Sequence, residues 1–235
     1  MTDQQPSAPT LSPDDPRSAF GRAVTTARVV IASVRPDQLD LPTPCEEFTV
    51  RDLLGHVLSA LDRVAVVGRG EDPFAPGTVR TAPVVANDGW ADAWTQCAHG
   101  VQDVWSDPAL LDRTFTLPWA TTTGAGILAF YTGEITVHTW DLATATGIAA
   151  PWDAQVVEVA ERAIRASMPA EGRLAIFQAV VATMPEDRRS DRPPFQEAVT
   201  ADEGAPTLER LIAFAGRHPA GTGRAPRRRG AGGGS

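Results

Sequence analysis

Apolar residues recur every three or four positions along several stretches of this chain, which is the spacing of one face of an α-helix. The first such stretch covers residues 17–34 and follows an acidic cap and a first-turn proline. The second begins near Val50, where Thr49 and Asp52 resemble a capping box. The third is capped by Asn87 or Asp88 and runs to about Trp105. The pattern therefore predicts three helices joined by proline- and glycine-rich loops.

The stretch 124–147, GAGILAFYTGEITVHTWDLATATG, has the pattern of one long helix that ends at a glycine. Ionisable groups lie in the middle of its otherwise apolar face, and a carboxylate buried beside an imidazole is costly unless the two share a partner. Glu134 and His138 are four residues apart, so one helix places both on the same divalent metal ion. The residues that share this face are Phe130, Glu134, His138, Asp141, Leu142 and Ala145.

The remainder of the chain predicts shorter elements. A short strand is expected at Thr114–Leu117, and helices are expected after Pro151, over 172–184 and over 207–216. Four well-patterned helices indicate an all-α fold, a four-helix bundle with a C-terminal, mainly helical extension. We expect a disordered N-terminus at 1–15, a metal-binding four-helix bundle at 16–148, the helical extension at 149–219 and a disordered tail at 220–235.

The amino-acid composition of the chain restricts the kinds of partner that it can bind. A formal net charge of −8 argues against a nucleic-acid surface, which needs a basic stripe. The chain contains no run of 18 apolar residues and no charged-then-apolar leader, so neither a membrane span nor export is expected. The two cysteines are too few for a disulfide framework. We therefore expect a soluble cytoplasmic protein, a monomer or homodimer, that acts on a small molecule.

The predicted helices place the four histidines of the chain in different surroundings. His99 is expected on the outer side of the third helix, and His218 near the end of the last one. His56 on the second helix then joins Glu134 and His138 on the fourth, and three ligands with open positions are what a catalytic zinc or a similar metal needs. The spacing leaves an alternative open: two core histidines and a partly exposed carboxylate, because such pairs are common on helices.

Two motifs resemble a known family. TPCEEFTVRDLLGHV at 43–57 is similar to the TPCxxWTVRDLLxH signature of the DinB-like superfamily, in its mycothiol-dependent maleylpyruvate isomerase branch; Phe48 stands where that family often has Trp. GEITVHTWDLATATG at 133–147 resembles the family's ExxxHxWDLAxATG segment. The closing segment 194–219 resembles the C-terminal end of an actinobacterial subfamily of uncharacterised metal-binding proteins within that group.

The resemblance implies a DinB-like four-helix bundle and a divalent metal, most often zinc with nickel as the other candidate, held by His56, Glu134 and His138. It also implies a low-molecular-weight thiol, mycothiol in an actinobacterium, as cosubstrate at the open metal position. The thiolate would add to a small electrophilic substrate, giving transfer or a thiol-assisted isomerisation. Beyond the ligands, no catalytic residue is identified.

Two other functions stay open. A metal-dependent hydrolase would use bound water in place of the thiol. A metal-binding or ligand-binding protein without turnover would need no general acid or base, and none is evident beyond the ligands. Asp141 would either orient a ligand imidazole or cap local backbone. Cys45 is expected to be a small buried residue rather than a reactive thiol. The candidates for lining the pocket are Trp90, Trp119 and Tyr131.

Overall fold

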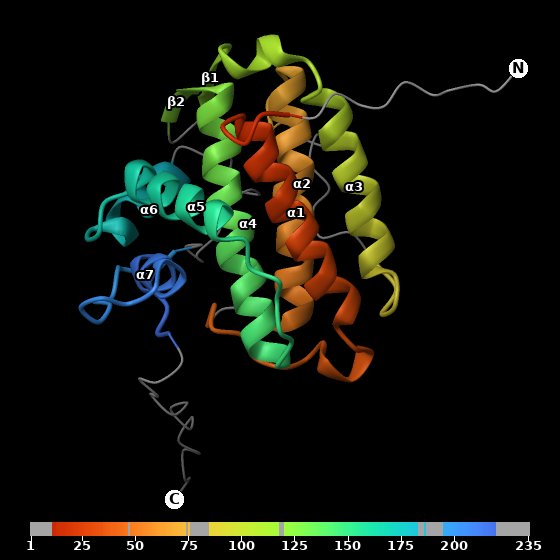
Figure 1. Cartoon of the computed structure of the whole chain (residues 1–235), viewed down its shortest axis with the longest axis vertical. Coiled ribbons are helices and arrows are strands. Elements are labelled where there is room, and N and C mark those ends of the chain that lie inside the picture. The colour runs from red at the N-terminus through yellow and green to blue at the C-terminus, as the bar shows by residue number, and fades with distance from the viewer. Residues whose placement is uncertain are drawn as a thin grey trace, which may run out of the picture.

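The fold is described by a computed structural model, and it is the all-α arrangement that the sequence predicts. The described residues are 11–46, 48–73, 75, 85–117, 120–182, 186 and 195–219. Four long helices form the bundle (Figure 1): α1 (Pro16–Ser33), α2 (Val50–Arg69), α3 (Trp90–Val104) and α4 (Gly124–Thr146). Three further helices follow: α5 (Ala154–Ser167), α6 (Arg173–Ala182) and α7 (Thr207–Phe214).

Short elements connect the helices of the bundle. Single 3-10 turns are formed by Pro36–Gln38 and Pro108–Leu111. The strand predicted at β1 (Thr114–Leu117) is confirmed, and it pairs antiparallel with β2 (Ala120–Thr123). The sequence did not predict β2, because ATTT has no alternation of apolar and polar residues. The hairpin leads directly into α4.

Local side-chain caps fix where the first two helices begin. Asp15 accepts a hydrogen bond from the Arg17 backbone N–H at 2.9 Å. At α2 the Asp52 N–H donates to Thr49 Oγ1 at 3.2 Å, and the Thr49 N–H donates to Asp52 Oδ2 at 3.1 Å, which is the capping box that the sequence predicts. The cap predicted for α3 is wrong. That helix follows Gly89 without a side-chain cap, and Asn87 Oδ1 accepts instead from Arg51 at 2.8 Å.

Helix α4 is the centre of the structure. It packs against α1 and α2 on one side and against α5 on another, so it is buried nearly all round rather than on the single face that the spacing predicted. Its buried threonines do not leave polar atoms unpaired: Thr132, Thr136 and Thr139 donate to the carbonyl four residues earlier at 2.7, 2.7 and 2.6 Å. The outermost residues of the predicted face, Phe130 and Ala145, are only half buried.

The C-terminal extension packs directly on α4. Helix α5 lies against α4 and α1, and α7 lies against α5, on the side of α4 away from α3 (Figure 1). A second apolar cluster joins these elements to α4: Val137, Val157, Ala160, Ile164, Phe195, Leu211, Ile212, Phe214 and Ala215. The boundary at 148/149 stays a prediction.

The ends of the chain are described in part. Of the predicted disordered N-terminus, residues 11–15 are described and include a turn in which the Asp15 N–H donates to the Ser12 carbonyl at 3.0 Å. The predicted disordered tail, 220–235, lies outside the described residues. None of the helices in the described part of the chain has the length and apolar character needed to span a membrane.

A glycine permits the close approach of α5 to α4, and its replacement gives a test of this packing. A Cβ at Gly133 would lie 2.5 Å from Ile164 Cγ1. We expect Gly133→Ala to lower the free energy of unfolding, because overpacking costs about 1–3 kcal/mol while the gain in helix propensity is only about 1 kcal/mol. Urea denaturation measures the change.

The matched control is Gly21→Ala, in the middle of α1, where an added Cβ would meet no atom within 4 Å. This variant should be more stable than wild type by about 0.5–1 kcal/mol. Equal stability of the two variants would contradict the close packing of α5 on α4.

Candidate metal centre

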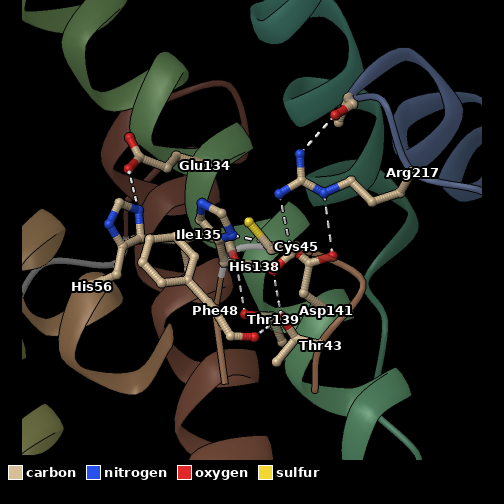
Figure 2. Close-up of polar contacts among 11 residues, drawn as sticks. Thr43, Cys45, Phe48, His56, Glu134, Ile135, His138, Thr139, Asp141 and Arg217 are labelled. Atoms are coloured by element: carbon tan, nitrogen blue, oxygen red, sulfur yellow. Dashed lines mark hydrogen bonds and ion pairs between the residues drawn. The ribbon is translucent and has the colours of Figure 1, made fainter. Parts of the chain in front are cut away.

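The three predicted ligands come together between α2 and α4 (Figure 2). His56 Nε2 lies 3.3 Å from Glu134 Oε1. The rings of His56 and His138 meet edge to face, with centroids 4.8 Å apart. One donor atom from each of the three residues lies within 4.8 Å of the other two. Two imidazole nitrogens and a carboxylate oxygen therefore converge on one point, although the residues come from separate helices.

Burial favours a shared partner for this group. Glu134 is 5% exposed, which contradicts the alternative of a partly exposed helix carboxylate, while the His56 side chain is 21% exposed. His138 is fully buried, yet its Nε2 has no hydrogen-bond partner among the described residues. An unpaired buried nitrogen is costly. A metal ion would satisfy it, and a donor set of two histidines and a glutamate suits zinc.

The other nitrogen of His138 is held by a buried carboxylate. His138 Nδ1 lies 3.0 Å from Asp141 Oδ2, and both side chains are completely buried. Of the two roles that the sequence left open for Asp141, this contact supports orientation of the imidazole. With the proton on Nδ1 and facing the carboxylate, the lone pair of Nε2 points toward His56 and Glu134.

An arginine from the C-terminal extension pairs with the same carboxylate. Arg217 Nη2 lies 3.0 Å from Asp141 Oδ2, and its Nε donates to Oδ1 at 3.3 Å. Both side chains are buried, so the attraction is little screened by solvent. Figure 2 shows Asp141 between His138 and Arg217. Arg217 was not predicted from the sequence, because only tertiary contact brings residues 76 positions apart together.

The surroundings of His138, Glu134 and Asp141 shift their pKa values toward the protonation states in which side chains of these types bind a metal. Burial lowers the pKa of His138, which favours the neutral imidazole. Burial would raise the pKa of Glu134, but the hydrogen bond and charge of His56, with the nearby charge of Arg63, contribute to lowering it overall. Burial likewise opposes ionisation of Asp141, but the charge and hydrogen bond of Arg217 together with the contact to His138 outweigh it, so the Asp141 pKa is also lowered. Two carboxylates are thus ionised beside a neutral imidazole at neutral pH.

Aromatic rings cover both histidines. Phe48 stacks on His56 with centroids 5.3 Å apart and an interplanar angle of 29°. Phe195 stacks on His138 at 6.0 Å and 24°. Phe48, the departure from the motif, is therefore in contact with a predicted ligand. Phe195 was not singled out by its sequence, since it follows a proline-rich stretch with no helical spacing.

A second polar pair lies one turn from Glu134. Tyr131 is fully buried, and its burial raises the pKa of the phenol to about 12 although the charge of Arg63 opposes the rise. Arg63 lies two turns after His56 on α2, and its charge acts on both Tyr131 and Glu134. The seven-residue spacing of His56 and Arg63 was the signal that could have identified this arginine.

The remaining pocket candidates stay predictions. Trp90 is buried in the core of the bundle on α3, which packs against α1 and α2. Trp119 lies outside the described residues. His99 is exposed, as expected.

A second donor group shares His138. Cys45, which is buried as predicted, has its Sγ within 4.8 Å of donor atoms of His138 and Asp141. Within this group, Asp141 already contacts His138 Nδ1. The guanidinium of Arg217 also lies on that carboxylate and repels a second cation. The side of His138 that faces His56 and Glu134 is therefore the better metal site.

Comparison with known proteins finds a matching family and two relatives, but no solved structure. A family model described as "Mycothiol maleylpyruvate isomerase N-terminal domain" matches residues 20–143. An uncharacterized protein of Mycobacterium tuberculosis strain CDC 1551 / Oshkosh is 30% identical over 203 residues, which cover 86% of this chain and 98% of that protein. An uncharacterized protein of strain H37Rv gives the same values. No solved structure matches the chain significantly.

Metal content tests the convergence of the three donors. Wild-type protein loaded with zinc and freed of excess by gel filtration should retain about one zinc per chain, the stoichiometry of a single site. His138→Ala should retain little, because it removes a buried donor. His99→Ala, at an exposed position on α3, is the matched control and should retain the wild-type amount. Equal zinc in the two variants would remove His138 from the ligand set.

A second pair of variants tells the two donor groups apart. Cys45→Ala should keep its zinc, whereas Glu134→Gln should lose most of it, because the amide is a far poorer metal ligand than the carboxylate. Atomic absorption of the purified proteins measures both. The reverse result would place the metal between Cys45, His138 and Asp141 instead.

Proposed function

The chain belongs to the mycothiol maleylpyruvate isomerase N-terminal domain family, and from this membership and the donor set we propose that it is a metal-dependent enzyme. It would use a low-molecular-weight thiol such as mycothiol, either for transfer to a small electrophilic substrate or for its isomerisation. The observation that carries the proposal is the convergence of His56, Glu134 and His138, because three protein ligands leave a coordination position for another molecule.

The chemistry of the site suits such a role. A zinc ion on these three ligands would lower the pKa of a bound thiol, so that a thiolate nucleophile exists at neutral pH. Glu134 is ionised, and His138 is neutral with its Nε2 unprotonated, so neither must lose a proton before it binds the metal. Of the three ligands His56 is the one whose side chain reaches solvent, which makes its side of the site the route for the thiol.

Two further groups favour an anionic or carbonyl-bearing substrate. The Tyr131 phenol, with a pKa of about 12, stays protonated at neutral pH and keeps a hydrogen-bond donor one turn from Glu134. The Arg63 guanidinium supplies a positive charge that acts on both Tyr131 and Glu134. A carboxylate, or an oxygen that gains negative charge as a thiolate adds to its molecule, would be stabilised by both groups.

Thiol binding and turnover test the proposal. Zinc-loaded protein should bind mycothiol in isothermal titration calorimetry, and the analogue with a hydroxyl in place of the thiol should bind much more weakly, because oxygen lacks the affinity of a thiolate for zinc. Metal-free protein and His138→Ala are the controls. Each should bind mycothiol and its hydroxyl analogue with similar affinity.

A panel of small electrophiles then distinguishes the alternatives. Consumption or rearrangement of an electrophile that depends on both zinc and thiol supports the proposal. Turnover that needs zinc but proceeds equally well without thiol would identify a hydrolase. Retained zinc with neither thiol binding nor turnover would indicate a metal-binding protein without catalysis, and the enzyme assignment would be withdrawn.

A further inference from the structure

The C-terminal extension reaches His138 by two separate contacts. The ring of Phe195 stacks on the imidazole. Arg217 pairs with Asp141, the carboxylate that holds His138 Nδ1. Both residues lie outside the part of the chain that matches the family model, residues 20–143. One face of a predicted metal ligand is thus built by a segment about 60 to 80 residues beyond it, brought there by the fold.

A tight turn after α7 places Arg217. The Gly216 N–H donates to the Ala213 carbonyl and the Arg217 N–H donates to the Ile212 carbonyl, both at 3.0 Å, which are the two hydrogen bonds of a Schellman motif. Gly216 has a φ of +83°, and a Cβ there would lie 2.8 Å from backbone atoms of Gln196. Only glycine fits this turn, so the chain reverses and directs Arg217 back toward α4.

The guanidinium is then held on several sides. Its Nη2 and Nε donate to the two oxygens of Asp141, and its Nη1 donates to the Ala215 carbonyl at 2.7 Å. The group also lies over the Phe195 ring, 5.4 Å from the centroid. A planar fork with this geometry fixes both the position and the rotation of the carboxylate, which a lysine ammonium does not do.

We propose that Arg217 is a positioning residue of the metal centre. It locks Asp141, Asp141 locks the tautomer and orientation of the His138 ring, and His138 Nε2 is thereby presented to the site formed with His56 and Glu134. The extension completes the metal centre and sets the affinity for the ion. This inference rests on the proposed metal-dependent function, because it concerns the same three ligands.

The competing explanation is that the Arg217–Asp141 pair only attaches the extension to α4. Loss of one partner of a buried pair destabilises a protein by leaving a charge uncompensated, whatever its effect on a metal site. The two explanations differ in the metal-binding constant. Loss of an outer partner of a metal-bound histidine typically reduces metal affinity by about 10–100-fold, whereas loosening of the extension alone leaves the ligand geometry intact.

The test compares two buried arginines of the extension. Arg173 is 5% exposed, donates to the Pro169 and Gln196 carbonyls at 2.6 Å and lies over Phe214, and the contacts of the described residues do not join it to Asp141. Arg173→Met therefore weakens the extension without changing the carboxylate. The Kd for Zn²⁺, by competition with a chromogenic chelator, and the apo-protein Tm are measured for wild type, Arg217→Met and Arg173→Met.

We expect both variants to unfold at lower temperature than wild type, and Arg217→Met alone to bind Zn²⁺ about 10–100-fold more weakly. The visible absorption of the Co²⁺-substituted protein should also change in Arg217→Met and stay unchanged in Arg173→Met, because it reports ligand geometry. A Zn²⁺ Kd for Arg217→Met equal to that of wild type, or an equal loss in both variants, would overturn the inference.

Two additional variants apply if Arg217→Met does not fold. Arg217→Lys keeps the charge and loses the fork, and the double variant Arg217→Met with Asp141→Asn removes both charges together. Each should fold and bind Zn²⁺ more weakly than wild type, and wild-type affinity in both would overturn the positioning role. A wild-type protein that binds no Zn²⁺ would instead overturn the proposed function itself, and this inference with it.

Discussion

The burial of three ionisable side chains on one helix is the constraint on which the rest of the structure depends. Glu134, His138 and Asp141 all lie in the interior, where an unpaired charge or polar atom is expensive. Each is supported from a different direction: Glu134 by His56 of α2, Asp141 by Arg217 beyond α7, and His138 by Asp141 on one nitrogen only. Elements on both sides of α4 are therefore tied to its polar centre, and Nε2 of His138 is the atom that a further partner must satisfy.

A helix that carries these groups must also tolerate being covered on all sides. The hydroxyls of its buried threonines donate to carbonyls within the helix, so they need no hydrogen-bond partner from neighbouring elements. Gly133 removes the side chain where Ile164 of α5 lies closest. Helix α5 of the extension can then pack closely on α4. The extension thus covers the buried polar residues of α4 on the side away from α3.

The sequence predicted what depends on local spacing and could not predict what depends on the return of a distant segment. The capping box of Thr49 and the helix that carries Glu134 and His138 follow from short-range patterns. The grouping of these two residues with His56 was implied by the resemblance of two motifs to a known family. The cap expected before α3 failed because Asn87 has a tertiary partner in Arg51. Phe195 and Arg217 have no local signal of their role, since the stretch before Phe195 is irregular and the turn at Gly216 indicates only where a helix ends.

The two histidines of the site are held in unequal ways, and this asymmetry bears on how the site works. His138 is fully buried, with Phe195 on its ring and the Asp141–Arg217 pair on its Nδ1. His56 is partly exposed and is supported by Phe48 and Glu134. The 203-residue match to the mycobacterial relatives extends past residues 20–143, so the relatives share sequence in the extension as well as in the bundle. With a fixed donor on α4 and a more accessible one on α2, the proposed site would hold its ion from the inside and take up its ligand from the side of His56.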